Sequence, residues 1–226
     1  MSGSSRFRTL VLIILAVIPW PLKRLVYRWV FRWGIEPGAS VGVCVITAHH
    51  VHLGCGARIG HFTVVRNLPE LRLEDKAAIG QWNWITCGEL FTNGEAMVTP
   101  PKDQGLFMAP SAALTSRHYL DCACGIFIGE YAVVAGVRSA LLTHEIDIAT
   151  STVICEPIRI GKYGYIGSNV KLTPGSTVPD YCVVGMGAVV VGELTEERTL
   201  YAGVPAKAVR SLGDARFFDR EDARVR

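Results

Sequence analysis

Aliphatic residues recur at every sixth position over much of the chain. In the C-terminal half they stand at Ile160, Ile166, Leu172, Val178, Val184 and Val190. The position four residues after each of the first five is mostly small, as at Gly164 and Ala188. A period of six fits one short strand followed by a bend, with the small residue at the corner. The pattern predicts a solenoid whose stacked strands share a continuous aliphatic core.

The same phase holds upstream, with interruptions. It is found at Val41, Leu53, Ile59, Val65, Leu73, Ile79, Ile85, Ile128 and Val134. The segment "GELFTNGEAMVTPPKDQGLFMAP", residues 88–110, breaks the repeat and is predicted to be a loop, either part of a binding face or inert. We predict a mainly β chain with a β-helix over 35–195, a loop excursion at 88–110 and a C-terminal extension over 196–226.

Residues 1–34 do not follow the six-residue period. The apolar run Leu10–Ile18 is short of the roughly 20 residues that span a bilayer, and Pro19 and Pro21 interrupt a helix. A signal peptide is an alternative, because arginines precede the run, but no small-x-small cleavage site follows it.

A basic amphipathic helix is predicted over residues 22–33, "LKRLVYRWVFRW". Its apolar face holds Leu22, Leu25, Val26, Trp29, Val30 and Trp33, and three arginines occupy another face. Such a helix lies in the headgroup layer of a membrane and is attracted to anionic lipid. The alternative is a helix that packs on the protein's own core.

Charge and cysteine content narrow the function classes. The net charge of the 226 residues is +3, which does not suggest a nucleic-acid partner, and the first 35 residues carry six basic and no acidic side chains. The seven cysteines include no C-x-x-C pair, and Cys122 and Cys124 are too close for usual zinc-ligand spacing. We therefore interpret the cysteines as reduced, small core residues and predict no metal site.

The stretches "IGKYGYIGSNVKLTPGSTV" and "YAGVPAKAVR" resemble the hexapeptide-repeat acyltransferases, and more closely the bacterial exopolysaccharide and colanic-acid-type sugar O-acetyltransferases. The resemblance covers residues 35–210 approximately. It implies a left-handed parallel β-helix of triangular section, here with N-terminal amphipathic and hydrophobic helices. It also implies a homotrimer with acyl-CoA sites between neighbouring subunits.

The stretch "LLTHEID", residues 141–147, is similar to the catalytic segment of that family, with His144 in the general-base position. An imidazole, with a reference pKa of about 6.5, can take the proton of an acceptor hydroxyl near neutral pH. Glu145 or Asp147 could orient the ring, and a backbone carbonyl could do so equally. A polar corner residue without catalytic role is the alternative.

Upstream, "LTSRHYLDC" places Arg117, His118 and Asp121 together, and we predict that they line the acceptor pocket. His118 could equally be a buried, hydrogen-bonded histidine.

The resemblance places the acyl-CoA site along the C-terminal coils. The matching positions are Tyr165, Ser168, Gly185, Met186, Lys207 and Arg210. The last two match basic residues near the adenosine phosphates, where a cation is physically sensible. The chain departs from the usual V-T-K sequence after the last hexads, since it reads "VVGELTEER" there.

The resemblance thus implies an acyl-CoA-dependent, most simply acetyl-CoA-dependent, O-acyltransferase. It would modify a sugar hydroxyl of a polysaccharide or glycolipid precursor at the cytoplasmic face of the inner membrane, as a peripheral or monotopic protein. Two alternatives are a metal-dependent hydratase resembling the gamma-class carbonic anhydrases and a non-catalytic β-solenoid assembly protein. Metal analysis tests the hydratase alternative, and an assay of acyl-CoA turnover distinguishes the acyltransferase from a non-catalytic assembly protein.

Overall fold

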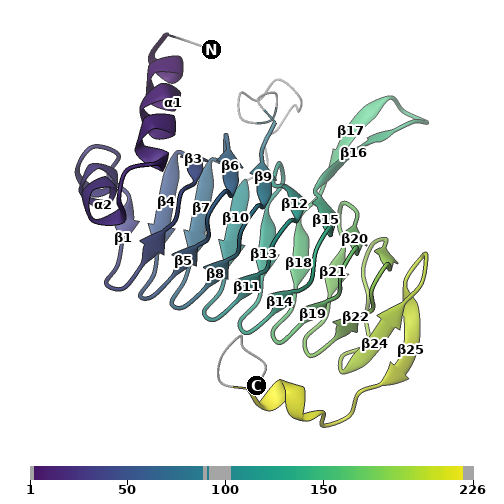
Figure 1. Ribbon diagram of the computed structural model, residues 1–226. Coiled ribbons are helices and arrows are strands. Elements are labelled where there is room, and N and C mark those ends of the chain that lie inside the picture. Colours follow the sequence, from purple (N-terminus) through teal and green to yellow (C-terminus); the bar gives the residue numbers. More distant parts are fainter. Residues whose placement is uncertain (1–2, 89–90, 92–102, 221–226) are drawn as a thin grey trace.

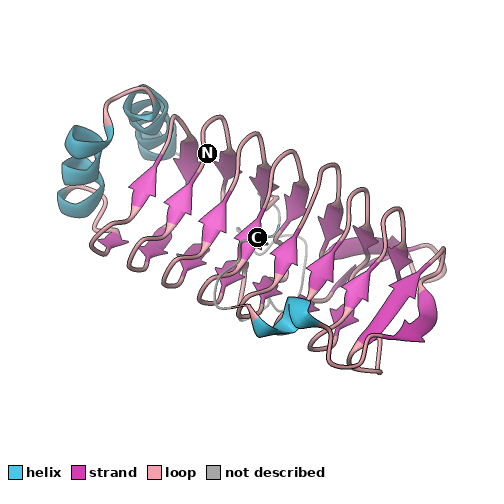
Figure 2. Cartoon of the chain, turned by 60° about the horizontal axis from the view of Figure 1, so that its bottom comes forward, coloured by secondary structure: helices cyan, strands magenta, loops and turns pink. Residues whose placement is uncertain are grey.

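The computed structural model describes residues 3–88, 91 and 103–220, which wind into a three-sided prism of parallel strands (Figures 1 and 2). Each face of the prism is one sheet. Sheet A contains β1 (Gly34–Ile35), β4 (His50–Leu53), β7 (Glu70–Leu73), β10 (Gly105–Met108), β13 (Ile126–Ile128), β18 (Ile158–Ile160) and β21 (Thr177–Val178).

Sheet B contains β2 (Ser40–Val41), β5 (Arg58–Ile59), β8 (Ala78–Ile79), β11 (Ala113–Leu114), β14 (Val133–Val134), β19 (Tyr165–Ile166), β22 (Val183–Val184), β24 (Thr199–Ala202) and β25 (Lys207–Ser211). Sheet C contains β3 (Val45–Thr47), β6 (Val64–Arg66), β9 (Trp84–Thr86), β12 (Tyr119–Asp121), β15 (Ala140–Leu142), β20 (Lys171–Leu172) and β23 (Val189–Val190).

The six-residue repeat places one aliphatic side chain of each strand inside the prism. Along sheet C, Ile85, Leu120 and Leu141 lie opposite one another in the parallel ladder, and all three are fully buried. Each such burial stabilises the fold by about 1.5–3 kcal/mol. The small positions are inside as well, as at Ala188. The predicted solenoid and its aliphatic core are therefore confirmed.

The boundaries of the solenoid differ from the prediction at two places. Strand β10 lies within the predicted 88–110 excursion and pairs with β7 and β13, so residues 105–110 belong to the coils, while 89–90 and 92–102 lie outside the described residues. Strand β24, in the predicted extension, pairs in parallel with β22. In both strands the buried residues are not a multiple of six positions from those of the preceding strand, so the six-residue pattern did not predict these strands.

A second excursion was not predicted. After β15 the chain leaves the prism as an antiparallel hairpin of β16 (His144–Asp147) and β17 (Thr152–Cys155), which projects from the coils in Figure 1. It returns through Glu156, whose N–H donates to the carbonyl of Thr143 at 2.9 Å.

Cys124 and Cys155 form a disulfide that joins the base of this hairpin to the preceding coil. The interpretation of all cysteines as reduced is therefore wrong for this pair. The two residues are 31 positions apart in sequence, and only the return of the hairpin brings their Cα atoms to 5.7 Å, within disulfide range.

Two helices, α1 (Gly3–Ala16) and α2 (Trp20–Trp29), cover the N-terminal end of the prism (Figure 2). Leu12, Leu15 and Tyr27 are buried in the main core. Lys23 is also buried, and its ammonium group donates to the carbonyl oxygens of Ala16 at 3.3 Å and Gly42 at 2.5 Å, which ties both helices to the first coil. Neither described helix has the length and apolarity needed to cross a bilayer.

Candidate active site

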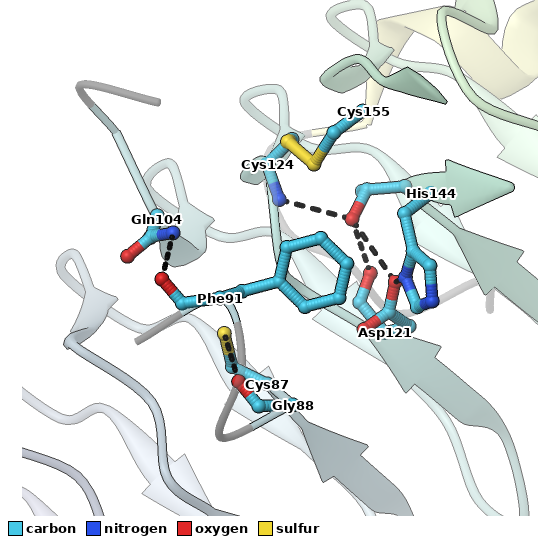
Figure 3. The surroundings of a disulfide bond; sticks show 9 residues. Cys87, Gly88, Phe91, Gln104, Asp121, Cys124, His144 and Cys155 are labelled. Carbon is cyan, nitrogen blue, oxygen red and sulfur yellow. Dashed lines mark hydrogen bonds and ion pairs between the residues drawn. A yellow bond between two sulfur atoms is a disulfide. The ribbon is translucent and has the colours of Figure 1, made fainter. Parts of the chain in front are cut away.

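His144 begins the hairpin at the corner where the chain passes from sheet C to sheet A. Its Nδ1 lies 2.5 Å from Oδ2 of Asp121, the last residue of β12 on the preceding coil (Figure 3). The Asp121 side chain is only 5% exposed, whereas that of His144 is 37% exposed. A carboxylate against Nδ1 fixes that nitrogen as the N–H donor, so Nε2 carries the free lone pair.

Thr143 holds the aspartate in place. Its hydroxyl lies 2.9 Å from the Asp121 carbonyl oxygen and 3.2 Å from Oδ2, and it accepts a hydrogen bond of 3.0 Å from the Cys124 N–H. Phe91 covers the imidazole, with 4.5 Å between the ring centroids. The histidine is therefore fixed from two sides, and its ring is left partly open to solvent.

The structure does not place Glu145 or Asp147 against His144, as the sequence had suggested. Both are an odd number of residues away along β16, and successive side chains of a strand point to opposite faces. Asp147 instead accepts hydrogen bonds from Thr150 and Ala149 in the hairpin turn, which lower the pKa of its carboxyl group. Asp121, predicted for the acceptor pocket, occupies the orienting position.

His118 and Arg117 lie away from this pair, at the opposite edge of sheet C. His118 is buried: Nδ1 accepts from the Ser139 N–H at 3.2 Å, and Nε2 lies 2.9 Å from the Thr115 hydroxyl. Burial lowers its pKa to about 4, so the ring is neutral at pH 7. The second of the two readings of His118 is thus the observed one, while Arg117 is exposed.

Two thiols near Asp121 are unsuited to nucleophilic catalysis. Burial, together with the charge of Asp121, raises the pKa of Cys87 to about 12 and that of Cys122 well above its usual value. The thiolate is the nucleophilic form of cysteine, so both side chains are unreactive near neutral pH.

The predicted acyl-CoA residues gather on a different side of the prism from His144. Tyr165 begins β19 in sheet B, Ser168 and Met186 lie at the corner after sheet B, and Lys207 and Arg210 are exposed on β25. Gly185, which precedes Met186, donates its N–H to the carbonyl of Tyr201 at 2.7 Å. His144 stands at the corner after sheet C, so one chain does not bring the two sets together.

Among the described residues, no group of three or more histidine, cysteine, aspartate and glutamate side chains could hold a metal ion.

The three-sided parallel coils have the fold of the left-handed β-helices seen in solved hexapeptide-repeat acetyltransferases. Profiles of known protein families give no match to the chain. Two curated proteins are similar to it. The galactoside O-acetyltransferase of Escherichia coli K12 is 38% identical over 58 residues, which are 26% of this chain and 28% of that protein. A probable acetyltransferase of Mycobacterium tuberculosis is 26% identical over 202 residues, 87% of this chain and 63% of that protein. The chain thus spans less than two thirds of the length of each relative.

Solved structures show the same fold. A hexapeptide-repeat acetyltransferase of Vibrio cholerae, complexed with acetyl coenzyme A, matches with a TM-score of 0.50 and 22% identity over 63% of this chain and 72% of that one. The polysialic acid O-acetyltransferase OatWY matches with a TM-score of 0.58 and 16% identity over 80% and 84%. These findings confirm the predicted fold and the resemblance to hexapeptide-repeat acetyltransferases.

Proposed function

We propose that the protein is an acyl-CoA-dependent O-acyltransferase, with acetyl-CoA as donor and a sugar hydroxyl as acceptor. The observation that carries the proposal is the His144–Asp121 pair, with Nε2 unoccupied by any described residue, on a fold shared with acetyltransferases. The named acceptors of similar proteins, galactoside and polysialic acid, are carbohydrates. Formation of CoA thiol from acetyl-CoA, dependent on added glycan, is the direct test.

Transfer proceeds in one displacement under this proposal. His144 Nε2 accepts the proton of the acceptor hydroxyl as its oxygen bonds to the thioester carbonyl carbon. The same nitrogen returns the proton to the CoA sulfur as the carbon–sulfur bond breaks. Asp121 stabilises the imidazolium that exists between these steps. The high pKa values of Cys87 and Cys122 support direct transfer, because neither thiol is ready to form an acyl-enzyme.

Lys207 and Arg210 suit the phosphates of the donor. Both are exposed on β25, and no described carboxylate forms an ion pair with either. We expect that Lys207→Ala with Arg210→Ala raises KM for acetyl-CoA by about tenfold or more, while KM for acetyl-pantetheine changes little, because only the full donor carries the phosphates. Steady-state kinetics with both donors is the measurement. An equal effect on the two would place these residues elsewhere.

We further propose that the active form is a homotrimer with donor sites between subunits. The support is geometric: His144 and the donor residues stand at different edges of one prism, and a neighbouring copy in a cyclic assembly can present one edge to the other.

A mixing experiment tests this arrangement. Subunits carrying His144→Asn are expected to be inactive on their own, and subunits carrying the Lys207 and Arg210 substitutions are expected to keep about a tenth of wild-type activity or less at low acetyl-CoA. Equimolar refolded mixtures are expected to regain about a quarter of wild-type activity, since about one interface in four then combines two intact edges. Mixtures that remain as inactive as the separate variants would show that each chain builds its own site.

We also propose that α1 and α2 attach the protein to a membrane surface, on the cytoplasmic side where acyl-CoA is made. Both helices expose apolar side chains, which together are here called the membrane face: Leu10, Ile13, Ile14, Val17, Leu22, Leu25, Trp29 and Val30, all at least 48% exposed. Exposed apolar residues on helices that also carry arginines suit an interfacial anchor. Trp33, predicted for this face, instead stacks on Tyr27 at 4.2 Å and is buried.

A further inference from the structure

The corner between sheets B and C carries a row of outward residues from six successive coils. These residues all have positive φ angles of 59–75° and are Phe62, Trp82, Arg117, Arg138, Asn169 and Gly187. Backbone hydrogen bonds join the row from coil to coil. The Trp82 N–H donates to the His61 carbonyl at 3.1 Å, and the Arg138 N–H donates to the Arg117 carbonyl at 2.8 Å. Side chains on adjacent coils therefore stand side by side along this edge.

Aromatic rings occupy the N-terminal part of the row. Phe62 and Trp82 stack with 4.5 Å between centroids and are 49% and 54% exposed. Trp84 and Tyr119, opposite each other in β9 and β12, are also about half exposed. A bulky residue at positive φ costs about 1–2 kcal/mol relative to glycine. The fold gains little packing from these rings, and exposed aromatic clusters mark binding surfaces.

The next two coils continue the row with cations. Arg117 and Arg138 are exposed, and neither forms an ion pair with a carboxylate in the part of the chain that the structure describes. We call the four rings together with these two arginines the aromatic–arginine edge.

A buried polar network lies directly beneath this edge. The residue after each row member points inward, and four of these residues are polar and at most 2% exposed: Thr63, Asn83, His118 and Ser139. Asn83 accepts the N–H of His118 at 2.9 Å, and its amide group donates to the Thr115 carbonyl at 2.7 Å. His118 in turn accepts the N–H of Ser139 at 3.2 Å. Satisfied buried networks fix a backbone in one arrangement, so the outer side chains are presented on a rigid support.

We propose that the aromatic–arginine edge binds an extended, acidic segment of the acceptor glycan. Trp and Tyr rings combine an apolar face with a polar tip, which suits the apolar faces of sugar rings between their hydroxyls. The arginines offer planar, two-pronged recognition of a carboxylate or phosphate on the chain. Along the same edge, Ser168 and Met186 follow on the next two coils, which places the proposed donor beyond the arginines.

This proposal rests on the proposed sugar O-acyltransferase function and adds the charge class and the path of its acceptor. The path begins at the end of the prism that the two helices cover, where a membrane-borne acceptor would arrive (Figure 1). A second copy that pairs symmetrically through this edge is a poorer occupant, because it would bring the arginines against their own counterparts, whereas the cyclic trimer proposed above sets a neighbour's His144 edge beside the donor residues of this corner.

The test measures glycan binding without acyl transfer. Wild-type protein is titrated calorimetrically with oligogalacturonate as the acidic probe and with a malto-oligosaccharide of equal length as the neutral probe. We expect that Trp82→Ala weakens binding of the acidic probe by about tenfold and that Arg117→Gln with Arg138→Gln does the same, the latter with loss of salt dependence. Phe107→Ala and Arg58→Gln, on other faces, serve as matched controls and should bind like wild type.

The outcomes separate this inference from the proposed function. Binding that depends on the edge in a protein that transfers no acyl group would retain the inference and overturn the function. Transfer to a small sugar by wild type, without binding of the acidic probe or without any effect of the edge variants, would overturn the inference alone. Dissociation of the oligomer by Trp82→Ala, seen by light scattering, would show an interface between copies and also overturn it.

Discussion

Replacing His144 by alanine is expected to lower kcat for acyl transfer by roughly 10²–10⁴-fold, because the acceptor hydroxyl loses its general base. Alanine also leaves the buried Asp121 carboxylate without its partner, which costs stability. His144→Asn separates the two effects, since its amide group can still donate to Asp121 but offers no base at the Nε2 position. Both variants should lose transfer, and only the alanine variant should melt clearly lower.

Asp121→Asn completes this comparison. The uncharged amide can still position the imidazole but cannot stabilise its charged form, so kcat should fall by about tenfold or more. Steady-state assays of the variant beside wild type measure this fall. Turnover of His144→Asn within a few-fold of wild type would mean that another group is the base.

Polar substitutions on the membrane face are expected to release the protein from lipid. Burying one Leu or Trp side chain stabilises attachment by about 1.5–3 kcal/mol, and the copies in an oligomer act together. Leu25→Glu with Trp29→Glu should therefore weaken binding to anionic vesicles by at least ~100-fold. Vesicle flotation gives the bound fraction, and activity on a soluble acceptor should be retained.

Surface substitutions test membrane attachment more specifically than removal of the N-terminal segment. Deletion of residues 1–33 would also remove the buried Leu12, Lys23 and Tyr27 and uncover the first coil. Ile148→Glu with Val191→Glu changes two other exposed apolar residues and is the matched control. Equal flotation of the two double variants, or a wild-type protein that ignores vesicles, would show that the helices serve packing alone.

The hexad phase predicted the coils well, because each aliphatic position has a fixed place inside a triangular section. Residues such as Ile166 and Val184 could be assigned to the core by counting alone, and both are fully buried. The excursions could not be found in this way. A hairpin such as β16–β17 uses its own antiparallel pairing, which leaves no trace in a six-residue count.

The apolar residues of the segment 22–33 have two roles in the structure: some face outward and others pack in the core. Leu25 and Trp29 are exposed, as a membrane-facing helix requires, whereas Trp33 and Tyr27 stack inside the core. Helical spacing gives the relative directions of side chains around the axis. It does not say which of them the neighbouring coil will cover, since that depends on the docking of α2.

By itself, the sequence determined the solenoid, its aliphatic core and the singular position of His144, because these follow from local periodicity and from residue type. The tertiary structure decided which carboxylate meets the imidazole. Glu145 and Asp147 are nearer in sequence, but strand alternation turns them away, and the parallel ladder between β12 and β15 brings Asp121 from 23 residues upstream. It also decided that Cys124 meets Cys155 and that His118 lies beneath an edge of exposed rings. When coils stack, residues that are far apart along the chain become neighbours on adjacent strands. Because excursions of irregular length interrupt the coils, a fixed six-residue count along the sequence cannot tell which residues these are.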